Sequence, residues 1–194
     1  MKLLNIKKQT NNKFLNMYEL ELRNKKGDKK TYFVASRRDQ EDLCCVTKDH
    51  AKADGVMIIP ITKEGEVIVI KQYRPAIDDY IYELPAGLVD DGEEAIVSLK
   101  RELKEETGLD IVEIIPGLGR DKVYLSPGMT DESVNLVYCT CDGELSKDGL
   151  EEDEDLEPLL ISKEEAKAIL QSDSKIDIKC LMVLQSFINI NIDI

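Results

Sequence analysis

The stretch that decides the fold runs from Gly87 to Leu109 and reads GLVDDGEEAIVSLKRELKEETGL. Its second half has apolar residues at positions 95, 96, 99 and 103, which is the spacing of an amphipathic helix. This pattern predicts a helix over 93–107. The helix should end at Gly108, because glycine commonly follows the last turn of a helix.

Three glutamates, Glu102, Glu105 and Glu106, lie three and four residues apart on this predicted helix. They fall within an arc of about 100° beside the apolar stripe, so we expect Glu106 at the border of the buried surface. Clustered carboxylates withdrawn from water need a neutralising cation. The pattern alone is compatible with a solvated face paired with nearby Lys and Arg side chains, or with a site for a divalent ion such as Mg²⁺.

Composition and charge exclude several classes of protein. The net charge of −13 argues against nucleic-acid binding, which requires a basic surface. The five cysteines include no CxxC pair, so no zinc site is expected, and an odd number of cysteines fits a reducing cytosol. No run of eighteen apolar residues occurs, so we expect a cytoplasmic protein without a membrane span. His50 lies in the polar stretch KDHAKADG and is predicted to be a loop histidine.

The rest of the chain mixes strand and helix signals. Alternating apolar and polar residues predict a β-hairpin over 13–36. Two arms rich in β-branched residues around the turn KEGE predict a second hairpin over 55–74. Pro85 and Gly87 predict a bend in a strand over 81–89. Further predicted elements are strands near 111–125 and 133–142, an acidic loop over 142–158, a helix that starts at Ser162 with a capping box, and a last helix over 176–188. This order predicts an α+β protein with a mixed sheet and helices packed against it.

The Gly87–Leu109 stretch resembles the Nudix box at every defining position. The matching residues are Gly87, Glu93, Arg101, Glu102, Leu103, Glu105, Glu106, Gly108 and Leu109. With typical residue frequencies, such a match arises by chance on the order of 10⁻⁸ to 10⁻⁹ per start position. The resemblance therefore favours a metal-binding helix over a merely solvated one.

The resemblance implies a Nudix fold, with a mixed β-sheet sandwiched between helices, and an enzyme that cleaves nucleoside diphosphates linked to another group. It implies Mg²⁺ as the cofactor, with Mn²⁺ as an alternative. The metal ligands within the box region would be the Ala86 carbonyl and the side chains of Glu102, Glu105 and Glu106. Arg101 would orient the glutamates and, with Glu105, take part in catalysis, while Gly87 and Glu93 would support the ligands without binding the ion.

Residues 72–87 resemble ADP-ribose pyrophosphatases, in the segments Gln72-Tyr73-Arg74-Pro75 and Glu83-Leu84-Pro85-Ala86-Gly87. By this resemblance Arg74 would bind phosphate or ribose oxygens and Glu83 a ribose hydroxyl. The alternatives are a surface ion pair of Arg74 with Asp78 or Asp79, and a solvated edge-strand role for Glu83.

Two later segments also resemble this subfamily. Ser126-Pro127-Gly128 matches its proline-containing loop, and DGLEEDEDLEP (148–158) resembles its acidic loop. By that match Glu152 would be the catalytic base and Glu154 a metal ligand. The alternative positions in the loop are Glu151, Asp153 and Asp155.

The N-terminal segment resembles the extension of these enzymes. Residues 1–50 would form a β-hairpin extension that serves dimerisation, and 51–194 the Nudix hydrolase domain of a homodimer. Phe14 and Tyr32 occupy the positions of adenine-stacking aromatics, and Arg37 or Arg38 that of a cation near the substrate. Ordinary packing within the hairpin is the alternative for both aromatics.

Three functions follow from the resemblance. The first is metal-dependent hydrolysis of ADP-ribose, a small nucleotide sugar, to AMP and ribose 5-phosphate. The second is the same reaction on another nucleotide sugar such as GDP-mannose. The third is a module that binds ADP-ribose without cleaving it, which is disfavoured because the box is complete.

Overall fold

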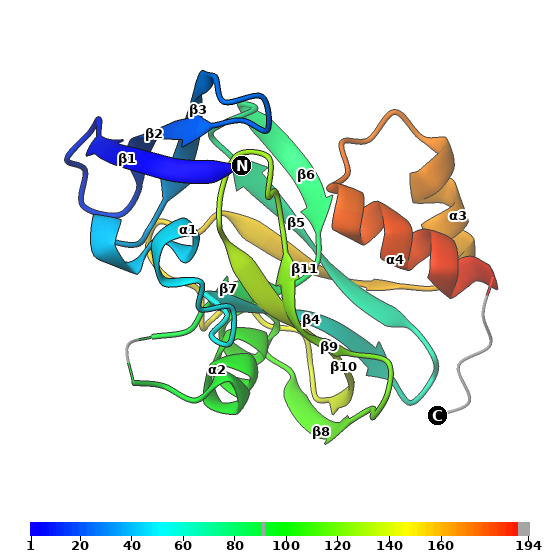
Figure 1. The fold of residues 1–194 in the computed structure, drawn as a ribbon. Helices are drawn as coiled ribbons and strands as arrows, with labels where there is room; N and C mark the ends of the chain where they lie inside the picture. The colour runs from blue at the N-terminus through cyan, green and yellow to red at the C-terminus, as the bar shows by residue number, and fades with distance from the viewer. Residues whose placement is uncertain (91, 190–194) are drawn as a thin grey trace. The chain divides into compact units, whose positions relative to one another are not determined.

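A three-stranded antiparallel sheet opens the chain in the order β1-β2-β3 (Figure 1). Its strands are β1 (Lys2–Lys8), β2 (Asn16–Arg23) and β3 (Lys29–Ser36). The β2–β3 hairpin confirms the prediction over 13–36, whereas β1 was not predicted. β1 has little alternation of its own and pairs with β2 over most of its length, so this partner decides its strand conformation.

The computed structural model describes residues 1–90 and 92–189, which divide into two compact units. The N-terminal unit contains Met1–Asp54 and Asp121–Val134, and the C-terminal unit contains Gly55–Arg120 and Asn135–Ile194. No sequence signal indicated that the segment Asp121–Val134 would join the N-terminal unit.

The N-terminal unit has its own small core and a partly buried ion pair. It also contains η1 (Gln40–Asp42), α1 (Cys44–Thr47) and the hairpin between β9 (Arg120–Tyr124) and the start of β10 (Ser133–Asp142). Tyr18 is fully buried, and its hydroxyl donates to the Arg38 carbonyl at 2.8 Å. The Arg38 guanidinium donates to Asp54 at 2.6 Å, and Asp54 also accepts from the Ser133 amide at 2.9 Å. These bonds join the strands to the Asp121–Val134 segment within one unit.

The C-terminal unit contains the larger sheet, with the strand order β11-β5-β4-β10-β8. β6 pairs with β5, and β7 pairs with β4. The bounds of its other strands are β4 (Gly55–Thr62), β5 (Val67–Arg74), β6 (Asp79–Glu83), β7 (Ala86–Leu88), β8 (Asp110–Ile114) and β11 (Leu156–Ile161). The β4–β5 hairpin confirms the prediction over 55–74, and the break between β6 and β7 is the predicted bend at Pro85.

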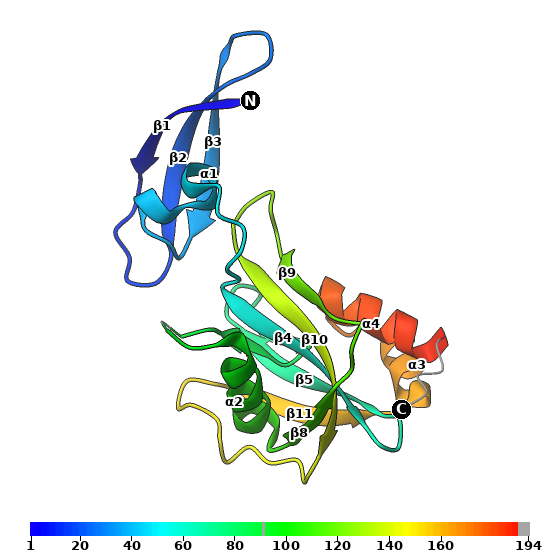
Figure 2. The ribbon, with the colours of Figure 1, turned by 60° about the horizontal axis from the view of Figure 1, so that its bottom comes forward.

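Helices lie on both sides of this sheet (Figure 2). They are α2 (Ala95–Thr107), α3 (Lys163–Gln171) and α4 (Ile178–Asn189). Leu99 and Leu103 of α2 are buried against Ile58, Ile68 and Cys139 of the strands. The predicted capping box at Ser162 is present. The predicted α+β architecture is therefore confirmed.

Two strand predictions need correction. The expected strand near 111–125 is two strands, β8 and β9, because the turn with Pro116 and Gly117 separates them. The end of the expected acidic loop is β11, which pairs with β5 from Leu156 to Ile161. A loop was expected here because the segment is acidic, contains glycines and shows no periodicity. β11 is at the edge of the sheet, where Pro158 is tolerated.

None of the helices in the described part of the chain combines the length and the apolar character that a bilayer crossing needs.

Candidate functional site

Helix α2 carries the predicted carboxylates. It ends at Gly108, which adopts a left-handed conformation (φ 79°) and donates its N–H to the Lys104 carbonyl, as predicted. Glu106 is buried, the Glu102 side chain is only 12% exposed, and Glu105 is half-buried. Ile96, which the periodicity placed in the apolar stripe, is exposed. The buried face is thus rotated toward Ser98, Glu102 and Glu106 and is more polar than expected.

Glu106 is a carboxylate held in the protein interior. Its Oε2 accepts the Ala86 N–H at 3.0 Å. Burial raises the pKa of Glu106 well above its ordinary value, and the neighbouring charges of Glu102 and Glu154 raise it further. Burial also raises the pKa of Glu102, although Arg101 opposes that shift. The ionised forms of these carboxylates are therefore unfavourable in their buried positions, and a bound cation would stabilise them.

Arg101 connects the carboxylates of the box. Its Nη1 donates to Glu102 Oε1 at 2.8 Å and to Glu105 Oε2 at 3.1 Å. Its Nη2 donates to Glu93 Oε2 at 3.1 Å and to the Leu88 carbonyl at 3.2 Å. The hydrogen bonds from Arg101 are the main reason why the pKa of Glu93 falls to about 2. One guanidinium thus links the loop after β7 to two of the three box glutamates.

Glu93 lies between Arg101 and the start of α2. Its Oε2 accepts from the Ser98 hydroxyl and from the Asp90 amide. Ser98 is fully buried and lies one turn before Glu102 on the same helix face. Sequence reasoning missed Ser98, although its position four residues before Glu102 was the available signal.

Gly87 leaves room for the Glu102 carboxylate. A Cβ at Gly87 would lie 1.8 Å from Glu102 Cδ and 2.0 and 2.2 Å from its two oxygens. No side chain fits there while the carboxylate keeps its position. The glycine at the start of the box therefore has a packing role in this chain.

The donor set fits a hard divalent ion, although no ready-made cage exists. Among residues 1–90 and 92–189, no three His, Cys, Asp or Glu side chains are arranged to hold a metal ion. Arg101 occupies oxygens of Glu102 and Glu105, so the guanidinium neutralises carboxylates that an ion would otherwise engage. The side chains that could bind an ion here offer only oxygen atoms, which Mg²⁺ and Mn²⁺ prefer. The carboxylate of buried Glu106 accepts one N–H, from Ala86, and has capacity for a further partner.

The acidic loop brings one of its two predicted residues toward α2. Glu154 is half-buried, and its charge contributes to the raised pKa values of Glu102 and Glu106. Its Oε2 accepts the Glu151 N–H at 3.0 Å. Glu152 is exposed, and its role as the base stays a prediction. Asp155, one of the alternatives, instead accepts from the Tyr80 hydroxyl at 2.5 Å.

Arg74 and Glu83 contact each other. Arg74 Nε and Nη2 donate to the two Glu83 oxygens, both at 2.8 Å, and this pairing raises the pKa of Arg74. The alternative pairing of Arg74 with Asp78 or Asp79 is wrong, because Asp78 accepts from Tyr73 and Asp79 pairs with Lys175. In the β5–β6 ladder Arg74 is opposite Asp79 and Glu83 is opposite Ile70, so the two residues lie on one face of the hairpin, four positions apart, and their long side chains meet along it.

The predicted substrate residues of the N-terminal extension all lie in the N-terminal unit. Phe14 is 65% exposed, with Lys13 Nζ 4.5 Å from its ring centre. The Tyr32 hydroxyl donates to the Gly128 carbonyl at 2.5 Å. Arg37 pairs with Glu132 at 3.4 Å. Their contribution to adenine binding stays a prediction.

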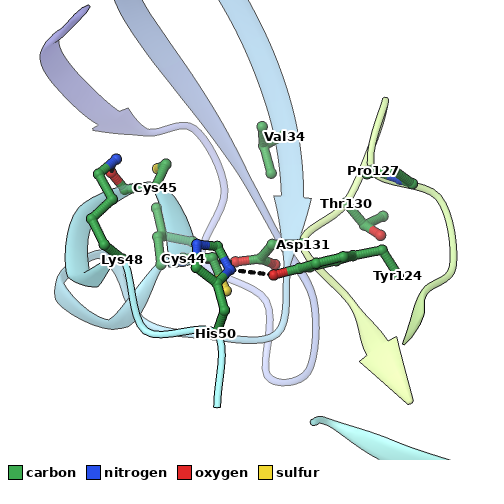
Figure 3. A pocket seen from close by; sticks show the side chains of 10 residues that line it. Val34, Cys44, Cys45, Lys48, His50, Tyr124, Pro127, Thr130 and Asp131 are labelled. Carbon is green, nitrogen blue, oxygen red and sulfur yellow. Dashed lines mark hydrogen bonds between the residues drawn. The ribbon is translucent and has the colours of Figure 1, made fainter. Parts of the chain in front are cut away.

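A pocket of about 300 Å³ lies within the N-terminal unit, beside α1 (Figure 3). His50 lies in an irregular segment, as predicted, but its Nδ1 is hydrogen-bonded to the Tyr124 hydroxyl. Asp131 accepts the Cys44 N–H at 3.2 Å on the same wall. The sequence did not indicate this pocket, since its residues come from 34–50 and 124–131.

The chain is similar to a described protein family and to several named enzymes. Residues 51–180 match the family model described as NUDIX domain. The chain is 34% identical over 134 residues to an "ADP-ribose pyrophosphatase" of Bacillus subtilis, which covers 67% of this chain and 69% of that protein. It is also 34% identical over 127 residues to an "ADP-sugar pyrophosphatase" of Mus musculus, covering 61% of this chain and 56% of that protein.

A solved structure supports the fold. The "Crystal structure of ADP compounds hydrolase" superimposes with a TM-score of 0.72 over 95% of this chain and 90% of that chain. Sequence identity is 20%, so this similarity concerns the fold alone.

Proposed function

Because the chain belongs to the NUDIX domain family and is a Nudix hydrolase, we propose that it hydrolyses the pyrophosphate bond of ADP-ribose to AMP and ribose 5-phosphate. The observation that carries this proposal is the cluster of carboxylates on α2, in which Glu106 is buried and Glu102 nearly so. The names of the Bacillus subtilis and mouse relatives support an ADP-sugar as the substrate.

We propose a divalent metal ion, Mg²⁺ or Mn²⁺, as the cofactor. The residues that would hold it are the Ala86 carbonyl and the side chains of Glu102, Glu105, Glu106 and Glu154. Such an ion, when bound, would neutralise the charge of the pyrophosphate and lower the pKa of a bound water.

The protein groups then have distinct tasks. Arg101, fixed by Glu93, would keep the glutamates oriented and move with them when the ion binds. Arg74 would exchange part of its pairing with Glu83 for phosphate oxygens of the substrate. Glu152, exposed to solvent, would accept the proton of the attacking water.

The test is a substrate panel with product analysis. Purified protein is incubated with Mg²⁺ and either ADP-ribose or GDP-mannose in H₂¹⁸O, and the products are identified by mass spectrometry. AMP and ribose 5-phosphate from ADP-ribose, with a higher kcat/KM than for GDP-mannose, supports the proposal. Preference for GDP-mannose makes the chain a hydrolase of other nucleotide sugars, and tight ADP-ribose binding without AMP makes it a binding module.

A substitution of Glu106 tests its assignment as a metal ligand. Glu106→Gln removes the buried charge with little change in volume and should lower kcat at least about 100-fold while the fold persists. The control is Glu113→Gln, a change at an exposed position on β8. Near-normal turnover in Glu106→Gln would overturn the assignment of Glu106 as a ligand.

We also propose a cytoplasmic homodimer in which residues 1–50 serve dimerisation. Light scattering coupled to size-exclusion chromatography of the full chain tests the dimer. A monomeric full chain contradicts it.

A further inference from the structure

The acidic loop between β10 and β11 carries two of the residues proposed for catalysis, and a tyrosine holds one end of it. We propose that Tyr80 is a positioning residue whose hydroxyl holds Asp155, and that this bond sets where the loop presents Glu152 and Glu154. The inference rests on the proposed function, because its consequence is measured as turnover.

The bond from Tyr80 acts where the loop joins the sheet. Leu156 is opposite Gln72 at the start of the β11–β5 ladder. The Tyr73 amide donates to the Asp155 carbonyl at 2.9 Å and extends this ladder by one residue. The Tyr80 hydroxyl donates to Asp155 Oδ2 at 2.5 Å. Asp155 is therefore held through both its backbone and its side chain, one residue after Glu154.

Tyr80 has a neighbour with the same chemistry and a different partner. Tyr73 and Tyr80 are directly opposite in the β5–β6 pairing, and their rings meet edge to face at 5.6 Å. The Tyr73 hydroxyl donates to Asp78 Oδ1 at 2.6 Å, in the turn between the two strands. Of these two hydroxyls, that of Tyr80 bonds to the acidic loop and that of Tyr73 bonds to the turn, which makes Tyr73 a matched control.

The other end of the loop packs against α2. A Cβ at Gly149 would lie 2.8 Å from Glu105 Cα and 2.9 Å from its carbonyl oxygen. The loop therefore spans six residues between its contact with the α2 backbone at Gly149 and Asp155, which Tyr80 holds. In between, the Glu154 amide donates to the Glu151 carbonyl at 3.1 Å, which closes a tight turn.

This geometry makes the position of Glu154 depend on Asp155. A loop pinned at Gly149 and at Asp155 has little freedom to move its central carboxylates, whereas a loop pinned at one end samples many positions. Misplacement of a catalytic group by about 1 Å is enough to reduce turnover strongly. Loss of one exposed hydrogen bond, in contrast, should change the overall stability little.

The experiment compares Tyr80→Phe with Tyr73→Phe in the full chain with Mg²⁺ and ADP-ribose. Tyr80→Phe should lower kcat by about 3- to 10-fold, with KM and melting temperature unchanged. Tyr73→Phe keeps its backbone bond to Asp155 and should keep the wild-type kcat. Asp155→Ala should reproduce the loss, and the double variant Tyr80→Phe/Asp155→Ala should lose no more than either single variant.

A second readout does not depend on activity. A glutamate-specific protease cleaves after Glu151, Glu152 and Glu154 when the loop opens, and mass spectrometry measures the rate. Cleavage should be about 3- to 10-fold faster in Tyr80→Phe than in wild type or Tyr73→Phe.

The two readouts separate the possible failures. Equal kcat for wild type and Tyr80→Phe overturns the positioning role, even if cleavage is faster. Equal cleavage rates for all three proteins overturn the tether itself. If wild type hydrolyses no nucleotide sugar, the proposed function fails and the positioning role fails with it, while the cleavage rates still decide whether the tether exists.

Discussion

Replacing Gly87 by alanine should disable the site while leaving most of the fold intact. The added Cβ would lie 1.8 Å from Glu102 Cδ, whereas carbon atoms in contact are about 3.5–4.0 Å apart. The Glu102 carboxylate must therefore move by about 2 Å. It is the end of a side chain with three rotatable bonds, so the clash is relieved by displacing Glu102 and not by moving the backbone.

The magnitudes separate the effect on stability from that on turnover. Displacement of the Glu102 carboxylate weakens its 2.8 Å hydrogen bond with Arg101 and forces the nearly buried Glu102 side chain from its preferred rotamer. Together these effects should lower the free energy of unfolding by about 1–3 kcal/mol. Alanine restricts the unfolded chain more than glycine and offsets about 0.5 kcal/mol of that cost. Since about 1 Å of misplacement can cost 100-fold in rate, we expect kcat to fall at least 100-fold.

The assay combines urea denaturation with the rate of AMP release from ADP-ribose and with Mn²⁺ binding measured by electron paramagnetic resonance. Gly119→Ala is the contrasting control, since its Cβ would lie 2.6 Å from the Leu136 carbonyl oxygen, a backbone atom. It should lose more stability than Gly87→Ala but keep turnover per folded molecule. Lys100→Ala, on the exposed face of α2, should change neither quantity.

A Gly87→Ala variant that turns over at more than about a third of the wild-type rate would refute the reasoning, because its Glu102 would then tolerate displacement. Loss of activity that parallels loss of folded protein in urea would refute it as well, since the effect would then be one on the fold.

Three further predictions concern stability. Leu103→Ala should lower the free energy of unfolding by about 2–5 kcal/mol in urea denaturation, because the side chain is fully buried in the core of the C-terminal unit. Asp54→Ala should cost about 2 kcal/mol, since it leaves the Arg38 guanidinium without its 2.6 Å partner; a cost below 0.5 kcal/mol contradicts this. The capping box lowers the pKa of Glu165 in the folded protein. The stability that ionised Glu165 contributes is therefore present above the unfolded pKa of about 4.3 and is lost as the pH falls through the lower folded pKa. The difference in melting temperature between wild type and Glu165→Gln should shrink over that pH range.

Local patterns predicted the elements that depend on residues near in sequence. The apolar period of 3.6 located α2, and Gly108 ended it because a left-handed residue terminates the helical hydrogen bonds. Alternation located the β2–β3 hairpin, and the β-branched residues of both arms located the β4–β5 hairpin. The spacing of Glu102, Glu105 and Glu106 was sufficient to place them together, because one helix carries all three.

Tertiary structure decided how charges are paired and which distant segments meet. Arg74 pairs with Glu83 because both side chains lie on one face of the β5–β6 hairpin, and Asp155 pairs with Tyr80 because β11 and β6 both pair with β5. β11 exists because β5 offers it an edge, despite Pro158. The segment Asp121–Val134 belongs with residues 1–54. Such contacts join residues that are far apart in the chain, and no local sequence period encodes them. The sequence by itself therefore determined the helix with the three glutamates, and the tertiary structure determined which residues surround it.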